Sequence, residues 1–150
     1  MSVAFWLKAA VVVPITEGGI VGNLSAGATS FVGWGVVFRW PAGLIKFERW
    51  NDGGPFTELT ATVSLDAWHF VVCTYSNVTG SKIYVDGQLK SSDATVLNVA
   101  NPSAPLQVGS TAWVPAPDQT FFQGVIDEVT VWGSELAAAD IANLYTAGTT

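Results

Sequence analysis

Hydrophobic and polar residues alternate over several short stretches of the chain, and turn residues separate these stretches. From Trp34 to Trp40 every second residue is large and apolar, so these side chains share one face of a predicted strand. Residues 44–50 follow a Pro-Ala-Gly turn and are expected to pair with that strand as a hairpin. Residues 57–64, rich in Thr and Val, predict a further strand.

The middle of the chain predicts a buried strand followed by a second hairpin. Residues 68–75 are apolar on both faces apart from two polar side chains, as expected for a strand in the middle of a sheet. Residues 82–85 and 88–90 flank Asp86-Gly87, a pair that favours a type I′ turn. These segments therefore predict a covered central strand with a hairpin after it.

Helical periodicity occurs only near the C-terminal end. Ser134 is the expected N-cap, Leu136 the expected first residue, and Ile141, Leu144 and Tyr145 share one face. Many short strands with frequent turns predict an all-β sandwich or barrel, here with one short helix. No internal repeat or linker divides the chain, so residues 1–150 are expected to form one domain.

Composition narrows the classes of partner. Hydrophobic residues make up 49% of the chain and charged residues 12%, which predicts a folded domain with a large core. The formal net charge of -6 would repel a phosphate backbone, so nucleic acid is not an expected partner. No segment reaches the ~18 consecutive apolar residues of a membrane span, so no membrane insertion is expected.

Five motifs follow one another along the chain in a fixed order. They are Phe5 to Lys8, Trp68 to Tyr75, Tyr84 to Gly87, Leu106 to Gly109 and Ile126 to Val129. From Ala4 to Tyr145 this order resembles the laminin-G-like members of the concanavalin A-like lectin and glucanase superfamily. The resemblance implies a jelly-roll-like β-sandwich of two antiparallel sheets with a short C-terminal helix. It also implies a domain that binds sugars or proteins.

One departure from the family pattern concerns the edge of a sheet. The resemblance implies an additional strand before the aromatic one, next to the C-terminal strand, whereas this sequence reaches Phe5 almost at once. An uncovered edge exposes unpaired N–H and C=O groups, which proteins normally protect. A homo-oligomer through the open sheet edge, or a partner strand, is therefore expected to complete the sheet.

The carboxylates do not match the catalytic pattern of the family's enzymes. The resemblance implies that its glucanases carry Glu-x-Asp-x-x-Glu on one strand, with both catalytic groups on one face. Here Asp127 and Glu128 are adjacent, so a regular strand would point them to opposite faces, and the next acidic residue is Glu135. The chain is therefore expected not to be an enzyme. A glycoside hydrolase or lyase is the least favoured alternative.

Calcium is the cofactor that the resemblance implies, and Asp127 is the candidate metal ligand. Calcium requires several oxygen ligands from carboxylates and carbonyl groups. Near the comparable place the chain offers only Asp118, Gln119 and Gln123, with Asn51 and Asp52 elsewhere. A site that bridges calcium to a ligand is therefore not favoured, and no cofactor is firmly expected.

Two further residue types are expected to be structural. Cys73 is the single cysteine and lies in an apolar stretch, which favours a buried thiol. His69 is the only histidine and has no Ser or Cys partner in a known motif, so we expect a hydrogen-bonded group near a strand edge.

The tryptophans give the best indication of function. Of the seven, Trp6, Trp68 and Trp132 lie in the family motifs and are expected in the core. Trp50 and Trp113 lie beside loops, where an exposed ring can stack on the apolar face of a sugar while polar neighbours bond its hydroxyls; packing of the rings onto the sandwich is the alternative. The predicted ligand surface consists of Trp50, Asn51, Asp52, Trp113, Asp118 and Gln119.

These features favour a non-catalytic, lectin-like carbohydrate-binding module, extracellular or on a particle surface. The alternative is a structural or adhesion subunit of an extracellular or virion surface assembly. Few charges, high apolar content and the shortened N-terminal region motivate that alternative, because exposed apolar patches mark interfaces.

Overall fold

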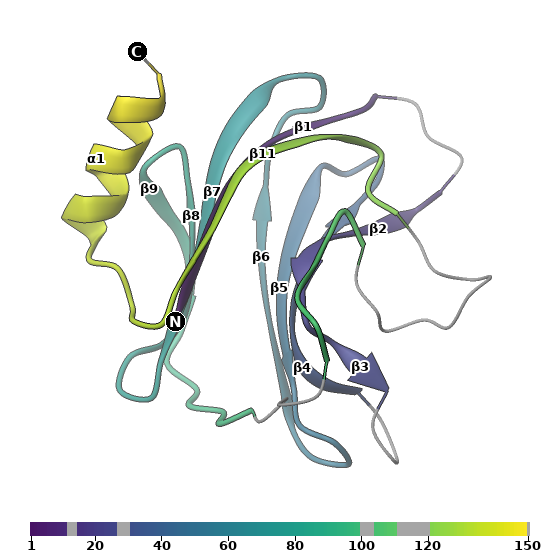
Figure 1. Cartoon of the computed structure of the whole chain (residues 1–150), viewed down its shortest axis with the longest axis vertical. Coiled ribbons are helices and arrows are strands. Elements are labelled where there is room, and N and C mark those ends of the chain that lie inside the picture. The colour runs from purple at the N-terminus through teal and green to yellow at the C-terminus, as the bar shows by residue number, and fades with distance from the viewer. Residues whose placement is uncertain (12–14, 27–30, 100–103, 111–120, 150) are drawn as a thin grey trace.

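Two antiparallel sheets face each other across a hydrophobic core, and one helix lies outside them (Figure 1). The computed structural model describes residues 1–11, 15–26, 31–99, 104–110 and 121–149. The five-stranded sheet has the order β11 (Gly124–Trp132), β1 (Ser2–Ala9), β7 (Trp68–Ser76), β8 (Gly80–Val85), β9 (Gln88–Asp93). The six-stranded sheet has the order β10 (Gln107–Val108), β2 (Glu17–Gly22), β4 (Phe31–Arg39), β5 (Leu44–Trp50), β6 (Phe56–Thr62), with β3 (Ser25–Ala26) paired to β4.

The two predicted hairpins and the predicted central strand are confirmed. β4 pairs with β5 through a turn, and β7 lies in the middle of the five-stranded sheet. Asp86 and Gly87 both have positive φ, 52° and 75°, as a type I′ turn requires. β9 extends to Asp93, so it is longer than residues 88–90.

β2 has no counterpart among the predicted strands. Its glycines hide the alternation that marks a strand, but they allow close approach of the backbone. A Cβ at Gly18 would lie 2.7 Å from the Phe121 carbonyl oxygen, and one at Gly22 would lie 2.6 Å from that of Trp34. The glycines of β2 are therefore needed for packing against neighbouring backbone.

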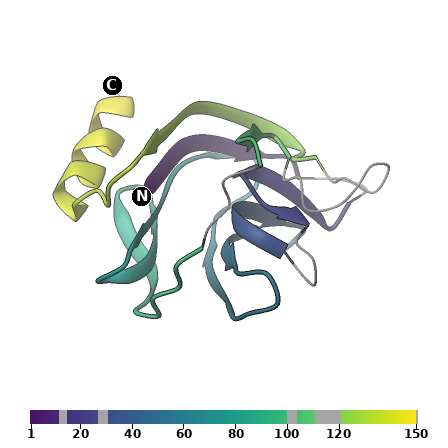
Figure 2. The same ribbon diagram turned by 60° about the horizontal axis from the view of Figure 1, so that its bottom comes forward.

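The core between the sheets follows the alternation of the strands. Inward-facing side chains of β1 meet those of β4 and β5 across the sandwich, and Figure 2 shows the two layers from a second direction. The fully buried members with the largest side chains are Phe5, Phe38, Phe47, Leu7, Ile20 and Ile45. Cys73 is buried in this core, as predicted.

The helix α1 (Ala138–Gly148) covers the outer face of the five-stranded sheet. Ile141 is fully buried against Phe70, Val72 and Tyr84, and the Tyr145 ring lies 6.0 Å from that of Trp6. The helix therefore forms a second, smaller core with the sheet.

The predicted start of the helix is wrong by two residues. The cap position is Ala137, without a side-chain hydrogen bond, and Ser134 does not cap the helix. Instead the Ser2 hydroxyl donates to the Ser134 carbonyl and accepts from the Leu136 N–H, both at 2.9 Å. Both groups precede the helix, so Ser2 of β1 fixes the segment that leads into α1 and does not cap the helix itself.

The expectation of a core position is wrong for Trp68. Trp68, Phe70 and Val72 share the outer face of β7, and α1 covers the latter two. The Trp68 side chain is 45% exposed, because it lies beyond the helix at the start of the strand. Trp6 and Trp132 are half-buried against the helix cluster.

Candidate functional site

Three aromatic side chains meet on the outer face of the six-stranded sheet. Trp50 ends β5 and lies directly opposite Phe56 at the start of β6. Their rings stack at 4.2 Å with an interplanar angle of 9°, and the Phe31 ring of β4 meets Trp50 edge-on at 5.5 Å. Phe56 is 52% exposed and Trp50 is half-buried. We call Phe31, Trp50 and Phe56 the aromatic cluster.

The loop after Trp50 borders this cluster. Asn51 is half-buried and its carbonyl accepts a hydrogen bond from the Gly54 N–H at 2.8 Å, while Asp52 is exposed. Trp50, Asn51 and Asp52, three of the predicted ligand residues, thus lie together at the end of β5. The other predicted ligand residues, Trp113, Asp118 and Gln119, lie outside the described residues. Sequence analysis missed Phe31 and Phe56, because their proximity to Trp50 depends on strand register.

Charged side chains continue along the same face from the aromatic cluster. Lys46 and Glu48 of β5 point to the same side as Trp50, and Glu58 lies opposite Glu48 on β6. Lys46 Nζ forms an ion pair with Glu48, lies 2.9 Å from Glu58 and 3.8 Å from Glu17 of β2. We call Glu17, Arg39, Lys46, Glu48 and Glu58 the charged strip, since Arg39 also pairs with Glu17, at 2.8 Å.

Lys46 and Glu48 are nearly covered by their surroundings, at 5% and 1% exposed. Burial raises the pKa of Glu48 above its ordinary value, and the hydrogen bond from Lys46 only partly offsets this. For Lys46, burial opposes the charge, but hydrogen bonds to Glu48 and Glu58 leave its pKa raised. One ammonium group therefore serves three carboxylates.

The charged strip does not resemble a hydrolytic pair. A retaining glycosidase needs one carboxylate as a nucleophile and a second carboxyl group as an acid, both directed at the substrate. Here Lys46 contacts both Glu48 and Glu58, and Trp50 Nε1 donates to Glu48 Oε2 at 3.4 Å. The two carboxylates are engaged in an ion-pair network, and Glu48 is buried, so they are not directed at a substrate.

His69 has two polar partners that sequence analysis did not identify. Ser64 Oγ lies 2.8 Å from His69 Nε2, and Asp86 Oδ2 lies 2.8 Å from His69 Nδ1. Asp86 Oδ1 also accepts the Phe70 N–H at 3.0 Å. The expectation of a hydrogen-bonded histidine is met, but a serine partner exists. Ser64 follows β6 and Asp86 lies in the β8–β9 turn, so the group links the two sheets.

Loss of the Asp86 carboxylate should destabilise this link. Asp86→Ala is expected to lower the free energy of unfolding by about 1–2 kcal/mol, because it removes two hydrogen bonds and places alanine at positive φ. Asp86→Asn keeps an acceptor and tolerates that φ, so its loss should be smaller. Urea unfolding of both variants measures the difference. Covalent labelling of Ser64 by a fluorophosphonate would contradict a purely structural role.

A β-bulge changes the orientation of the acidic pair in β11. Ala4 pairs with Thr130 and Trp6 pairs with Asp127, so Glu128 and Val129 together oppose Phe5. Glu128 has φ of 51°, and its N–H donates to Asp127 Oδ1 at 2.8 Å. The expectation that the two carboxylates point to opposite faces is wrong. Both line one pocket of about 400 Å³ beside Trp6, Trp68 and the end of α1.

Asp127 was also the candidate calcium ligand. Calcium takes about six to eight oxygen ligands, usually with several carboxylates. Within the described ranges, no three acidic, histidine or cysteine side chains are grouped so that they could hold a metal ion. Asp127 and Glu128 therefore do not by themselves fit a calcium site.

In the part of the chain that the structure describes, no helix has the length and apolar character needed to cross a bilayer.

Comparison with known proteins identifies a family for this chain and several solved structures with a similar fold. Residues 1–142 match the family described as the concanavalin A-like lectin/glucanases superfamily, in its laminin-G group. Among curated proteins, none has a sequence that matches this chain. The match to the family covers all the strands and the first half of α1.

The similar solved structures include binding domains of botulinum neurotoxins. The serotype G binding domain is 17% identical with a TM-score of 0.74, over 99% of this chain and 36% of that one. The serotype D receptor-binding domain is 19% identical with a TM-score of 0.71, over 98% and 37%. This chain thus spans little more than a third of the length of these relatives. At such identities the likeness shows the fold alone.

Proposed function

Because this chain belongs to the concanavalin A-like lectin/glucanases superfamily, we propose that it is a non-catalytic, lectin-like domain that binds carbohydrate. The observation that carries the proposal is the aromatic cluster beside the charged strip on one outer sheet face. Flat rings stack on the apolar face of a pyranose, and carboxylates accept hydrogen bonds from its hydroxyls. Two of the similar structures are receptor-binding domains of botulinum neurotoxins, which supports a recognition role.

The proposed binding surface centres on Trp50 and Phe56. Cross-strand stacking fixes both rings in one orientation, so they lose little freedom when a ligand binds. Asn51 and Asp52 supply polar groups at one side, and Glu58, with its side chain 36% exposed, supplies a carboxylate at the other. Trp113, Asp118 and Gln119 are proposed to complete the surface. The proposed location is extracellular or on a particle surface.

Removal of either the Trp50 or the Phe56 ring should weaken sugar binding. Trp50→Ala and Phe56→Ala are each expected to reduce affinity about tenfold, since truncating a central aromatic residue costs more than about 1 kcal/mol. A polysaccharide array covering plant, algal and bacterial glycans identifies a ligand, and titration calorimetry then measures the variants. Trp68→Ala is the matched control, because Trp68 is an exposed tryptophan on the other sheet. The proposal would be contradicted if no polysaccharide on the array bound, or if Trp68→Ala lost as much sugar affinity as the other variants.

A structural or adhesion subunit is the second candidate function, and the open edge of β11 favours it. Among the strands that the structure describes, β11 is the outermost of its sheet, with Val125 52% and Val131 44% exposed. Light scattering and the polysaccharide array together discriminate the candidates. A stable dimer or trimer that binds no sugar favours the subunit, including the predicted homo-oligomer through the sheet edge, whereas a monomer that binds sugar favours the lectin.

A further inference from the structure

The outer face of β6 carries a row of four exposed side chains. The strand alternates exposed and buried positions along its whole length, with Leu59 and Ala61 among those that face the core. The exposed positions are Phe56, Glu58, Thr60 and Thr62, which we call the β6 row. At the rise of an antiparallel strand the row is about 20 Å long, which exceeds the length of a single pyranose ring. An extended ligand can therefore contact one aromatic ring and three polar side chains of this strand.

Phe56 is the most accessible ring of the aromatic cluster. It is 52% exposed, whereas Trp50 is half-buried and has ring contacts with both Phe56 and Phe31. Phe56 covers one face of the Trp50 ring, with 4.2 Å between the ring centres. The exposed part of the Phe56 ring is therefore the part that can stack on a sugar, and Trp50 is a positioning residue that holds Phe56.

The polar members of the β6 row are spaced along the strand. Glu58 has its side chain 36% exposed, and a carboxylate can accept further hydrogen bonds while one oxygen contacts Lys46, here at 2.9 Å. The hydroxyl groups of Thr60 and Thr62 can each donate and accept. Successive residues on one face of a strand lie about 7 Å apart. These groups are thus placed to bond several linked sugars in turn and are not gathered around one.

The charges near the β6 row favour an uncharged ligand. The charged strip holds three carboxylates and two cations, and the exposed Asp52 adds a further carboxylate. Both cations of the strip pair with its carboxylates, and Lys46 is only 5% exposed. The cations Lys8, Lys82 and Lys90 belong to strands of the other sheet. An acidic polymer would therefore meet more negative than positive charge beside the row and be repelled.

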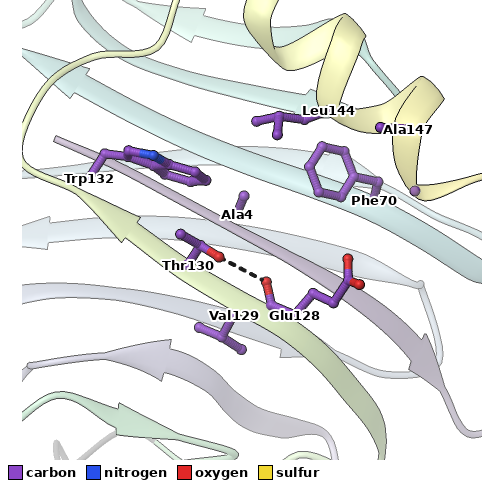
Figure 3. Close-up of a pocket in the computed structure, with 9 residues that line it drawn as sticks. Ala4, Phe70, Glu128, Val129, Thr130, Trp132, Leu144 and Ala147 are labelled. Carbon is purple, nitrogen blue, oxygen red and sulfur yellow. Dashed lines mark hydrogen bonds between the residues drawn. The ribbon is translucent and has the colours of Figure 1, made fainter.

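The groove between β11 and α1 is a poorer place for a chain of sugars. Its volume is about 490 Å³, and Figure 3 shows Phe70 between Trp132 of β11 and Leu144 of α1. Its lining is mainly apolar, and Glu128 and Thr130 are the polar side chains among the described residues that line it. The Thr130 hydroxyl already donates to the Glu128 carbonyl, 3.4 Å away. The groove therefore offers fewer groups to sugar hydroxyls than the β6 row does.

We propose that β6 binds an uncharged polysaccharide lengthwise, with several linked sugar rings along the β6 row. The inference rests on the proposed function and adds the class of carbohydrate and the direction in which it lies. Phe56 stacks on one sugar ring, and Glu58, Thr60 and Thr62 bond hydroxyl groups of the units that follow. Affinity comes from many units of the polymer, so a single sugar binds weakly.

The polysaccharide array tests the charge of the ligand. It includes neutral polymers, such as hydroxyethyl cellulose, galactomannan and laminarin, and acidic ones, such as carboxymethyl cellulose, polygalacturonate and alginate. At least one neutral polymer is expected to bind, equally at low and high salt, because an uncharged ligand makes no ion pair. Binding of an acidic polymer, or binding that changes with salt, would overturn this inference and leave sugar binding intact. Absence of any binder would contradict the proposed function as well.

Oligosaccharides cut from the bound polymer test the lengthwise arrangement. Titration calorimetry is expected to show at least about tenfold tighter binding of the tetrasaccharide than of the disaccharide, because the longer chain contacts more of the β6 row. Thr60→Ala and Thr62→Ala should each weaken the hexasaccharide about fivefold, the effect of one lost hydrogen bond, and leave the disaccharide unchanged. Equal affinity for all lengths would place the ligand at a single subsite and overturn the proposal.

Two further variants assign the binding to β6 and the roles to its rings. Thr130→Ala is the matched control, since Thr130 is an exposed threonine on a strand of the other sheet, and it should change neither affinity. Trp50→Phe keeps a ring beside Phe56 and should restore most of the affinity that Trp50→Ala loses. Loss in Thr130→Ala as large as in Thr60→Ala, or loss in Trp50→Phe as large as in Trp50→Ala, would contradict the assignment.

Discussion

Replacement of Lys46 by methionine is expected to lower the free energy of unfolding by about 3–5 kcal/mol at neutral pH. The Lys46 side chain is 7% exposed and its ammonium group contacts Glu48 and Glu58. Methionine fills the space but leaves Glu48 buried without a counter-charge. The loss therefore measures uncompensated charge more than lost packing.

The pH dependence of this loss has a definite sign. Burial raises the pKa of Glu48, so the folded state binds a proton there more tightly than the unfolded chain does. Stability from this protonation is present at pH values below the ordinary pKa of about 4.5 and is lost as pH rises through the raised value. Without Lys46 the pKa should rise further. The deficit of Lys46→Met should therefore shrink as the pH is lowered toward about 4.5.

Urea unfolding at neutral and acid pH measures both effects. Lys90→Met is the matched control, because Lys90 is an exposed lysine whose ammonium group bonds only to Gln88 among the contacts described. Its effect should stay below about 0.5 kcal/mol. A Lys46→Met loss that matches the control, or one that grows on acidification, would show that the charged strip is not a coupled network.

Replacement of Arg49, the second buried cation of β5, is expected to raise the free energy of unfolding instead of lowering it. Its guanidinium carbon lies 3.1 Å from the centre of the Tyr75 ring, inside the sandwich. Nε and Nη1 are buried and have no hydrogen-bond partner in the described structure, and burial lowers the pKa of Arg49. Each unsatisfied donor costs about 1–3 kcal/mol, which the contact with the Tyr75 ring offsets by about 2 kcal/mol.

Arg49→Met is therefore expected to raise the free energy of unfolding by about 2 kcal/mol. Thermal and urea unfolding at neutral pH measure the change. Arg39→Met serves as the control, because the Arg39 side chain is 51% exposed and pairs with Glu17 at the surface. That variant should change stability by less than about 1 kcal/mol. If Arg49→Met lowered the free energy of unfolding, the contacts of the guanidinium group would stabilise the fold by more than its unsatisfied donors cost.

The strands that the sequence predicts well are those with a local side-chain pattern. Alternation from Trp34 to Trp40 is visible in the chain itself, and the Asp86-Gly87 turn has its own chemistry. β2 could not be predicted in this way, because its glycines carry no side chain that could alternate between apolar and polar. The segment that leads into the helix is held by Ser2, which lies 132 residues before Ser134, so no local pattern could reveal this contact.

The candidate site was predictable only where a single loop forms it. Trp50, Asn51 and Asp52 are adjacent in sequence, and their grouping follows from that. The stacking of Phe56 on Trp50 depends on the register between β5 and β6. The shared surface of Asp127 and Glu128 depends on a bulge, which no alternation pattern signals.

The sandwich places the aromatic cluster and the groove between β11 and α1 on opposite outer faces, with the core between them. Ligand bound at the aromatic cluster would therefore leave the face that carries α1 accessible. Under the proposed function, several copies held on one surface would present several aromatic clusters to one polysaccharide, and each bound copy would raise the effective concentration of the next. Copies displayed side by side would then adhere through avidity, even where each single contact is weak.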